Sequence, residues 1–478
     1  MPRLPSILKP KIVPLLAVLA LALTLSACEK RQQFSTIFGP RQAGQGTAPP
    51  PTPVPTAPEA GPGMVLPPGD PALQAPGVQA DIPNPEDENF VPPAIPRMEA
   101  GVPRVAILLP LSGQNAAIGT ALLNAAQLAL FHFADRKFEL LPHDTRGTAE
   151  GAADAARFAI SDGASLILGP LFNFEVEAVA PAARAAGVKV IGFTSDKRVA
   201  RDGVYVMGFR PDEQVERVMR YAYGRGVRRF AFLGPEDTYG LTIRDAMQAA
   251  IPQLAGAELV QVAMYDPNAH DFAPIVRRLA EYDGRRANLL EQKKELAAQK
   301  DDEAAKAALR RLETQQTAGD VPFDALLIAD GGKRLEALAA LLPYYDIDPK
   351  RTRMLGTGLW DTPGIGKEPA LLGAWYAAPS PGARAAFEKQ YAEIYGAAPS
   401  RLATLAYDAT ALAALFAPAQ GLIDEATLTS PQGFAGRDGV FRFLPDGVAE
   451  RGLSVHQVNA NASTEISAAP TTFAPVTN

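Results

Sequence analysis

The stretch that most constrains the fold lies at residues 104–124, with the sequence RVAILLPLSGQNAAIGTALLN. Residues 105–109 are an unbroken apolar run, which is typical of a strand covered on both faces in a parallel sheet. Pro110 ends this run, the next residues favour a tight turn, and apolar residues at helical spacing continue to about Phe133. The stretch therefore predicts a buried strand and a helix that begins at the carboxyl end of that strand.

The same order of a strand and then a helix recurs along the chain in two series. The first series has apolar runs at residues 138–142, 166–168, 188–193 and 204–209. The second series has them at residues 230–233, 258–265, 325–329, 354–355 and 374–377. Strands that alternate with helices are typical of parallel sheets with right-handed crossovers. The sequence therefore predicts an α/β fold with two similar lobes, each built on a parallel sheet.

The last part of the chain departs from this alternation. Residues 440–443 and 453–458 are short strand candidates, and we expect them to form an antiparallel pair. The chain after Asn459 is expected to be disordered, so residues 461–478 are assigned to a disordered tail.

Composition argues against several classes of function. The chain has 478 residues, of which 47% are hydrophobic, and this is enough for two or three domains. A net charge of −6 gives no general attraction for nucleic acid. The single cysteine allows no internal disulfide, and the four scattered histidines form no metal-ligand spacing. No phosphate-binding loop, zinc-protease helix or nucleophile elbow occurs, so we expect no catalytic residue, no metal, no cofactor and no enzyme activity.

The N-terminus has the order of a targeting segment. Basic residues precede an almost wholly apolar stretch at residues 12–25, which is short for a membrane span. The small residues Ser26 and Ala27 then lead to Cys28, the only cysteine. This order resembles a bacterial lipoprotein signal, which implies a signal peptide at residues 1–27, cleavage before Cys28 and lipidation of its thiol. The alternative is an ordinary signal peptide or a transmembrane anchor with an incidental cysteine.

The lipoprotein resemblance also implies a location. In Gram-negative cells an aspartate after the lipidated cysteine retains a lipoprotein in the inner membrane, and here Glu29 follows Cys28. The resemblance therefore implies a lipid-anchored protein on the periplasmic side of the cell envelope, at the outer membrane. Residues 28–100 are rich in Pro, Gly, Ala and Gln, and such composition predicts a disordered tether. The tether either presents the folded region away from the membrane or serves as a spacer with no binding role.

Several segments at fixed order along residues 101–460 suggest a known family. They are VAILLPLSG at 105–113, Asp144-Thr145, ASLILGPL at 164–171, VKVIGFTS at 188–195 and EDTYG at 236–240. In this order they resemble the type I periplasmic binding proteins, in their leucine/isoleucine/valine-binding branch. The resemblance implies two Rossmann-like lobes joined by three crossovers, with a ligand cleft between them. On this basis lobe 1 comprises residues 102–212 and 378–435, and lobe 2 comprises residues 213–377 and 436–460.

Within that superfamily, LLPLSG and GASLILGPL resemble the penicillin-binding protein activator lipoproteins. The resemblance implies a regulator of peptidoglycan synthesis that contacts a peptidoglycan synthase. The activators of this type carry a helical-repeat domain before the fold, whereas this chain has only the Pro-rich tether there. The alternative is the substrate-binding lipoprotein of an amino-acid-type ABC transporter for branched-chain or similar amino acids, with a small amino-acid-like ligand.

The ligand cleft implied by the resemblance has a set of candidate residues. They are Ser112, Gly113, Phe172, Asn173, Thr194, Ser195, Tyr239 and Asp330. The family implies that residues after the third strand hold a ligand's carboxylate through hydroxyl groups, and here Phe172 and Asn173 offer none. It also implies that Tyr239 is an aromatic contact and that Asp330 meets a ligand's ammonium group. Alternatively, these residues are ordinary turn and helix-capping residues.

A charged insertion lies at residues 283–319, with the sequence DGRRANLLEQKKELAAQKDDEAAKAALRRLETQQTAG. It is rich in helix-forming residues and separates a helix and a strand that normally lie close together. We expect an inserted helical arm on lobe 2, with a sparse apolar seam at Leu289, Leu296, Leu309 and Leu312. The arm either packs along the lobe as a solvated helix or projects as a docking element for a partner.

Overall fold

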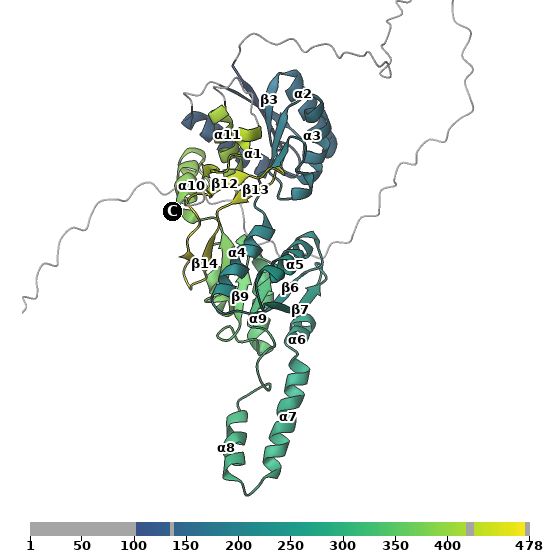
Figure 1. The fold of residues 1–478 in the computed structure, drawn as a ribbon, viewed down its shortest axis with the longest axis vertical. Helices are drawn as coiled ribbons and strands as arrows, with labels where there is room; N and C mark the ends of the chain where they lie inside the picture. Colours follow the sequence, from purple (N-terminus) through teal and green to yellow (C-terminus); the bar gives the residue numbers. More distant parts are fainter. Residues whose placement is uncertain (1–101, 134–137, 417–424, 474–478) are drawn as a thin grey trace, which may run out of the picture. The chain divides into compact units, whose positions relative to one another are not determined.

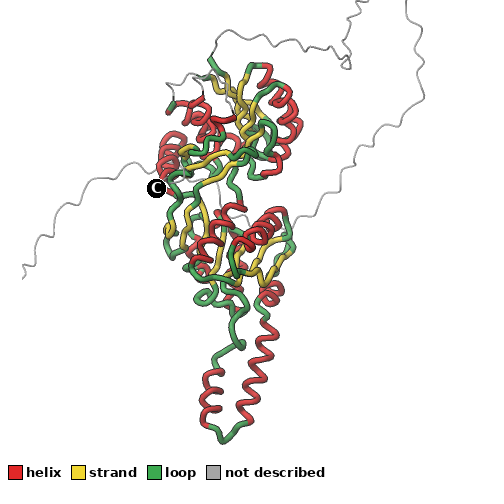
Figure 2. The backbone as a smooth tube through the Cα atoms, viewed as in Figure 1, coloured by secondary structure: helices red, strands yellow, loops and turns green. Residues whose placement is uncertain are grey.

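The computed structural model describes residues 102–133, 138–416 and 425–473. The expected signal peptide at residues 1–27, Cys28 and the tether at residues 28–100 lie outside this range. None of the helices in the described ranges has the length and apolar character needed to cross a membrane. Two sheets with helices on both faces, and a third small sheet, make up the fold (Figure 2).

Lobe 1 is built on a five-stranded parallel sheet with the strand order β2-β1-β3-β4-β5 (Figure 1). The strands are β1 Arg104–Leu109, β2 Glu139–Asp144, β3 Ala164–Leu168, β4 Lys189–Gly192 and β5 Val204–Val206. Its helices are α1 Ala116–His132, α2 Ala149–Ser161, α3 Asn173–Ala185, η1 Lys197–Val199, α10 Pro381–Tyr395, α11 Ala403–Phe416 and α12 Glu425–Leu428.

Alternate residues of β1 serve two separate apolar cores. Ile107 belongs to the core that includes buried residues of α1 and α11, whereas Leu108 belongs to the core formed with α2 and α3. Both side chains are fully buried, because a central parallel strand is covered by helices on both faces. This confirms the strand and the α/β architecture that the apolar run predicts.

Lobe 2 is built on a seven-stranded sheet with the strand order β15-β14-β10-β9-β8-β6-β7. The strands are β6 Arg229–Pro235, β7 Glu258–Tyr265, β8 Ala325–Ile328, β9 Arg353–Gly356, β10 Trp375–Ala378, β14 Ser454–Gln457 and β15 Thr464–Ser467. The first five are parallel to one another, whereas β14 is antiparallel to β10 and β15 is antiparallel to β14.

The helices of lobe 2 divide between the two faces of its sheet. The core on one face includes buried residues of α4 and α5, and the core on the other includes those of α6 and α9. The elements are α4 Pro211–Gly224, α5 Thr238–Ala250, η2 Ile251–Gln253, α6 Ala273–Leu279, α9 Gly332–Tyr344, η3 Gly358–Trp360, η4 Ile365–Lys367 and η5 Pro369–Leu371. Asp237 caps α5 by accepting a hydrogen bond from the backbone N–H of Gly240 at 2.9 Å.

The C-terminal part of the chain differs from the sequence expectation in three respects. A small antiparallel sheet contains β11 Phe434–Gly436, β12 Gly439–Phe443 and β13 Ala449–Arg451. Thus β12 pairs with β11 and β13, and the expected pairing of residues 440–443 with 453–458 is wrong. Phe441 and Phe443 are buried in the α1–α11 core of lobe 1, so residues 436–451 do not return to lobe 2 as expected. The expected disordered tail is also wrong at β15, which pairs with β14.

The charged insertion forms two helices, α7 Tyr282–Ala298 and α8 Glu303–Leu312. They lie side by side and extend away from the lobe 2 sheet as a hairpin (Figure 1). Leu289 and Ala305 are buried, and Leu296, Leu309 and Leu312 are partly buried. The apolar seam therefore closes the hairpin on itself, because these residues have little other surface to pack against. We call residues 282–319 the arm.

Candidate functional site

The candidate residues lie at the carboxyl ends of the strands in each lobe. In lobe 1 they follow three strands: Ser112 and Gly113 follow β1, Phe172 and Asn173 follow β3, and Thr194 and Ser195 follow β4. In lobe 2, Tyr239 follows β6 and Asp330 follows β8. Parallel strands place their carboxyl ends at one edge of a sheet, so the structure brings the six residues of lobe 1 to one edge and the two of lobe 2 to another.

Asp144, the last residue of β2, holds the loop between β1 and α1. Its Oδ1 accepts hydrogen bonds from the backbone N–H groups of Leu111 at 2.9 Å, Ser112 at 3.2 Å and Arg146 at 2.8 Å. Burial opposes the ionisation of Asp144, but hydrogen bonds from the Ser112 side chain and from these backbone groups lower its pKa. Gly113 has a φ of 75°, which glycine adopts without strain. Two backbone donors of this loop, those of Leu111 and Ser112, are therefore already used by a carboxylate of the chain.

Glu175, in the first turn of α3, holds the loop between β3 and α3. Its side chain is fully buried, and Oε1 accepts a hydrogen bond from Thr145 Oγ1 at 2.6 Å. Oε2 accepts a hydrogen bond from the backbone N–H of Phe172 at 3.1 Å. Burial raises the pKa of Glu175, and the hydrogen bonds from Thr145 and the backbone oppose that shift. A helix N-terminus attracts a carboxyl group, and here the chain supplies its own.

Asn173 and Thr194 are both bonded to Asp196, which follows β4. Asn173 Nδ2 donates to Asp196 Oδ2 at 3.1 Å, and Thr194 Oγ1 accepts from the backbone N–H of Asp196 at 3.1 Å. Arg198 donates to both carboxylate oxygens of Asp196, at 2.8 and 2.6 Å. Hydrogen bonds from the Arg198 side chain hold the pKa of Asp196 well below its ordinary value, against the effect of partial burial. Ser195 is exposed, and no hydrogen bond in the described residues engages its hydroxyl.

An aromatic pair covers the start of α3. The rings of Phe172 and Phe174 are stacked, with centroids 5.4 Å apart and planes 8° from parallel. Phe174 is 42% exposed. A stacked pair of this kind presents an apolar face rather than hydroxyl donors. The loop after β3 therefore suits an apolar or aromatic contact better than a carboxylate.

Asp330 of lobe 2 is buried beside a cation. Its Oδ2 lies 2.9 Å from Arg334 Nε and accepts a hydrogen bond from the hydroxyl of Tyr265, while its Oδ1 accepts one from the backbone N–H of Gly331 at 2.7 Å. Burial and the hydrogen bond to Asp330 raise the pKa of Tyr265. Because Arg334 already balances the charge of Asp330, an ammonium group would have to compete with a guanidinium for this carboxylate.

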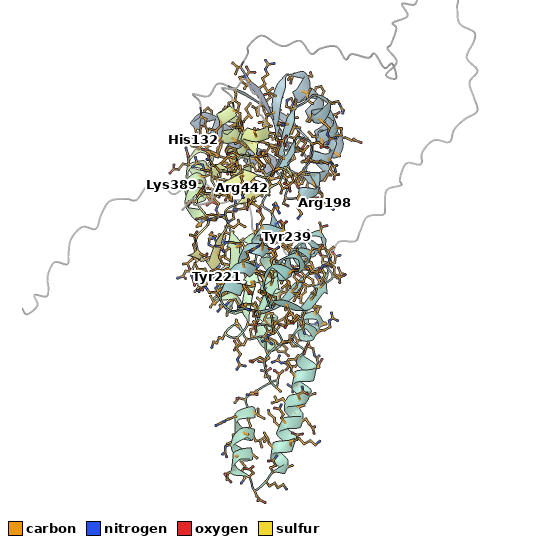
Figure 3. The ribbon with its side chains drawn as sticks, in the orientation of Figure 1. His132, Arg198, Tyr221, Tyr239, Lys389 and Arg442 are labelled. Carbon is orange, nitrogen blue, oxygen red and sulfur yellow. The ribbon has the colours of Figure 1, made fainter. Side chains whose placement is uncertain are left out.

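Tyr239 faces the loop that follows β9. Its hydroxyl lies 2.7 Å from Thr357 Oγ1, and burial raises the pKa of Tyr239 to about 12. Trp360 in the same loop donates from Nε1 to the backbone oxygen of Asp330 at 3.0 Å. Tyr239 and Asp330 are thus both tied to this loop. Figure 3 labels Tyr239 on lobe 2 and Arg198 on lobe 1.

Most of the residues that form hydrogen bonds or ion pairs with the candidate residues were not predicted as site residues from the sequence. The pair Asp330 and Arg334 could have been found, because residues four apart at the start of a helix are at ion-pair spacing. Glu175 could not have been found from the sequence. A helix-capping pattern requires Ser or Thr three residues before the glutamate, and the chain has Phe172 there. Tyr265 lies 65 residues from Asp330 and has no local signal. No cluster of His, Cys, Asp or Glu able to hold a metal ion occurs among the residues that the structure describes.

Comparison with solved structures shows the fold. The chain is similar to a putative branched-chain amino acid ABC transporter protein from Rhodospirillum rubrum, with 18% identity over 76% of this chain and 100% of that one, at a TM-score of 0.60. It is similar to an ABC transporter substrate-binding protein from Sphaerobacter thermophilus, with 19% identity over 78% and 98%, at a TM-score of 0.58. It is also similar to the C-domain of LpoA (YraM) from Haemophilus influenzae, a regulator of PBP1A, with 15% identity over 76% and 99%, at a TM-score of 0.52.

Comparison with families and with curated proteins completes the assignment. No curated protein matches the chain. The three structures are too distant in sequence to establish more than a shared fold. A family model described as periplasmic binding protein matches residues 103–462, which is most of the chain and includes both lobes. The chain therefore belongs to the periplasmic binding protein family.

Proposed function

We propose that this protein is a lipid-anchored regulator of peptidoglycan synthesis, similar in role to the penicillin-binding protein activators, and that it acts by contact with a peptidoglycan synthase. Its family implies a periplasmic or extracytoplasmic location. Lipidation at Cys28, a place at the outer membrane and the tether at residues 28–100 belong to the proposal, and the sequence features described above support them. The family and its neighbours are binding proteins, which is consistent with a role that needs no catalysis.

One observation carries the proposal: apart from the Ser195 hydroxyl, the polar side chains expected to hold an amino acid are engaged within the described part of the chain. Glu175 accepts hydrogen bonds at the start of α3, and Arg334 balances Asp330. The carboxylates of Asp144 and Asp196 lie in two further loops of the same edge of lobe 1. A ligand's carboxylate would meet these acidic groups at one end, and its ammonium group would have to displace Arg334 at the other. This arrangement favours function without an amino acid ligand.

The arm supports a role in protein contact. It extends from lobe 2 and exposes charged side chains along α7 and α8, with Leu290 exposed to 56%. The hairpin therefore offers an exposed surface for contact with a protein partner. The neighbour LpoA, described as a regulator of PBP1A, has the same fold in its C-domain, and this adds support to the choice of partner.

Thermal unfolding with a panel of amino acids tests the proposal. We would use the chain from residue 28 onward, with Cys28→Ser to prevent acylation. A ligand at a hundredfold excess over its dissociation constant stabilises a protein by about 2.7 kcal/mol, which shifts the melting temperature of a domain this large by about 2–4 °C. We expect no shift with leucine, isoleucine, valine or other free amino acids. A clear shift with one of them would instead favour the substrate-binding protein of an amino-acid-type ABC transporter.

A further inference from the structure

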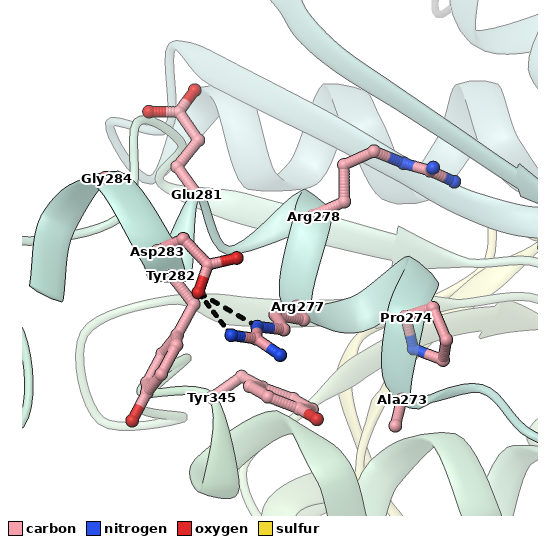
Figure 4. Close-up of a pocket in the computed structure, with 9 residues that line it drawn as sticks. All are labelled: Ala273, Pro274, Arg277, Arg278, Glu281, Tyr282, Asp283, Gly284 and Tyr345. Atoms are coloured by element: carbon pink, nitrogen blue, oxygen red, sulfur yellow. Dashed lines mark hydrogen bonds and ion pairs between the residues drawn. The ribbon is translucent and has the colours of Figure 1, made fainter.

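A cavity of about 600 Å³ lies at the root of the arm, where α6 leads into α7 (Figure 4). Its walls include Pro274, Arg277, Tyr282, Asp283 and Tyr345. The helices α6 and α9 run back from the carboxyl ends of β7 and β8, so their C-terminal ends lie toward the opposite edge of the sheet. The cavity therefore lies away from Tyr239 and Asp330, and nothing in the proposed function uses it.

We propose that this cavity binds a short oligosaccharide built from pyranose rings. The first argument is the pairing of Arg277 with Asp283. Arg277 donates from both Nε and Nη2 to the same oxygen, Oδ1, of Asp283. Among the described residues no hydrogen bond engages Arg277 Nη1 or Asp283 Oδ2. The pair thus presents an unused donor beside an unused acceptor, which matches two neighbouring hydroxyl groups of a sugar.

The second argument is the ring of Tyr282, which lines the cavity with that pair and is partly exposed. Tyr345 is 8% exposed and packs edge-on against Tyr282 from the core of lobe 2, with ring centroids 5.4 Å apart, so it holds the Tyr282 ring in place. Figure 4 shows Tyr282 and Tyr345 among the residues that line the cavity together with Arg277 and Asp283. The Tyr282 ring offers an apolar face with a polar tip, which suits a sugar ring because its C–H face is apolar and its rim carries hydroxyl groups.

The charge and size of the cavity narrow the class of ligand. Arg277 and Arg278 are matched by Glu281 and Asp283, so the charged groups of the walls sum to zero. A net neutral wall with several hydrogen-bonding groups favours a neutral polyhydroxylated ligand over an ion. The hollow is open to solvent, and its volume lies within the range of pockets that bind small ligands.

The root of the arm is held firmly enough to preserve this arrangement. Glu281 has a φ of 47°, a left-handed conformation that turns the chain sharply from α6 into α7. The buried side chain of Arg285 donates to the backbone oxygens of Ala280 at 3.2 Å and Gly319 at 2.7 Å, and pairs with Asp346 at 3.2 Å. These contacts tie both ends of the arm to the lobe, so the cavity is formed before a ligand arrives.

Binding of two trisaccharides to the chain from residue 28 onward, carrying Cys28→Ser, tests the inference. Tri-N-acetylglucosamine represents cell-wall glycan, and maltotriose represents other glucans. We expect isothermal titration calorimetry to detect binding of at least one of them at millimolar concentrations, and the preferred sugar would identify the source of the ligand. Arg277→Ala and Tyr282→Ala should each weaken binding about tenfold, since each removes roughly one directed contact.

Arg311→Ala is the matched control, because Arg311 is an exposed arginine on α8 that does not line the cavity. It should bind the sugar as the unmodified chain does. Asp283→Asn keeps the size of the side chain and provides a second variant if Tyr282→Ala lowers the melting temperature. Absence of binding of either sugar at about 10 mM would overturn the inference. Equal affinity of the unmodified chain, Arg277→Ala and Asp283→Asn would overturn it as well.

Discussion

Glu175 joins two elements of lobe 1 from a fully buried position. It connects the end of β2, through Thr145, with the start of α3, through the backbone N–H of Phe172. A buried carboxyl group that loses its hydrogen-bond partners destabilises the fold, because no water molecule replaces the missing hydrogen bonds. The same cost arises when the buried partners lose the carboxyl group. The residue therefore has a structural role at the start of α3, where its carboxyl group occupies the backbone N–H of Phe172.

Replacement of Glu175 should destabilise the protein more than replacement of its exposed neighbour Glu177. Glu175→Ala leaves the hydroxyl of Thr145 and the N–H of Phe172 without their acceptor, and we expect a loss of roughly 1–3 kcal/mol in the free energy of unfolding. Glu177→Ala, two residues further along α3, should change it by less than about 0.5 kcal/mol. Urea unfolding of both variants measures the difference, and equal losses would show that the Glu175 contacts are not important for stability.

Two buried carboxyl groups outside the candidate site should make stability depend on pH. Burial raises the pKa of Glu213 and of Asp408 to about 7 in each case. Both groups hold a proton more tightly in the folded than in the unfolded chain. Their contribution to stability is therefore complete below the unfolded pKa near 4 and is lost as pH rises through about 7.

The variants Glu213→Gln and Asp408→Asn should remove part of this pH dependence. Neither amide can ionise, so each variant should gain stability relative to the unmodified chain as pH rises from 5 to 8. Urea midpoints at the two pH values measure the gain, and the comparison cancels the opposite effect of other groups, such as His143 and His456, whose pKa values burial lowers. A constant difference between pH 5 and 8 would mean that neither pKa is raised.

Single residues show where sequence reasoning stops. Tyr239 and Asp330 could be placed on strand ends from the sequence, because apolar runs define the strands and polar residues follow them. Their hydrogen-bond partners could not be predicted from the sequence. Tyr265 contacts Asp330, and Thr357 contacts Tyr239, only after the sheet has formed. The hydrogen bonds that decide whether a site is open or satisfied are contacts between distant segments.

At the scale of elements, long periodic segments were predictable and short edge elements were not. The central strand β1 and helix α1 lie within one residue of the positions expected from apolar spacing. In contrast, β15 has only four residues, Thr464–Ser467, between turn-forming segments, and it depends on pairing with the edge strand β14. Likewise, β12 has an apolar pattern that suits either lobe, and burial of Phe441 in lobe 1 decides its place.

The arm depends on one buried arginine at its root. Arg285 is 7% exposed and contacts both ends of the arm, whereas the adjacent Arg286 is exposed. Arg285→Ala should therefore loosen the arm, and trypsin should cleave residues 286–311 faster while the two lobes stay folded. Arg286→Ala is the control. It removes one trypsin site, and trypsin should cleave the remaining sites of the arm no faster than it does in the unmodified chain. Equal cleavage of the two variants would contradict a structural role for Arg285.

At the scale of the whole folded region, an ion pair connects the two lobes. Arg384 lies on α10, which packs in lobe 1, and Asp361 lies in the loop after β9 of lobe 2. Arg384 Nη1 is 2.6 Å from Asp361 Oδ2, and both side chains are mostly buried. Such a pair restricts movement between lobes, because separating the two charges leaves each one partly desolvated and unpaired.

A double-mutant cycle measures how much this pair contributes. Arg384→Met and Asp361→Asn should each cost roughly 3 kcal/mol in the free energy of unfolding, since each leaves one group without its partner. The double variant should cost less than the sum of the two, because the second replacement removes the group that the first leaves unpaired. Strictly additive losses would mean that the two side chains do not interact in solution.

The central claim is that this binding-protein fold acts on a peptidoglycan synthase rather than on a free amino acid. The most direct measurement is the rate of glycan polymerisation by a purified class A penicillin-binding protein, with and without the chain from residue 28 onward. A variant that lacks residues 286–317 provides the comparison for the arm, provided that its melting temperature matches that of the intact chain. The account predicts a rate several-fold higher with the intact chain and a smaller effect with the variant. An unchanged rate at saturating concentrations of the intact chain, together with stabilisation by one amino acid, would contradict it.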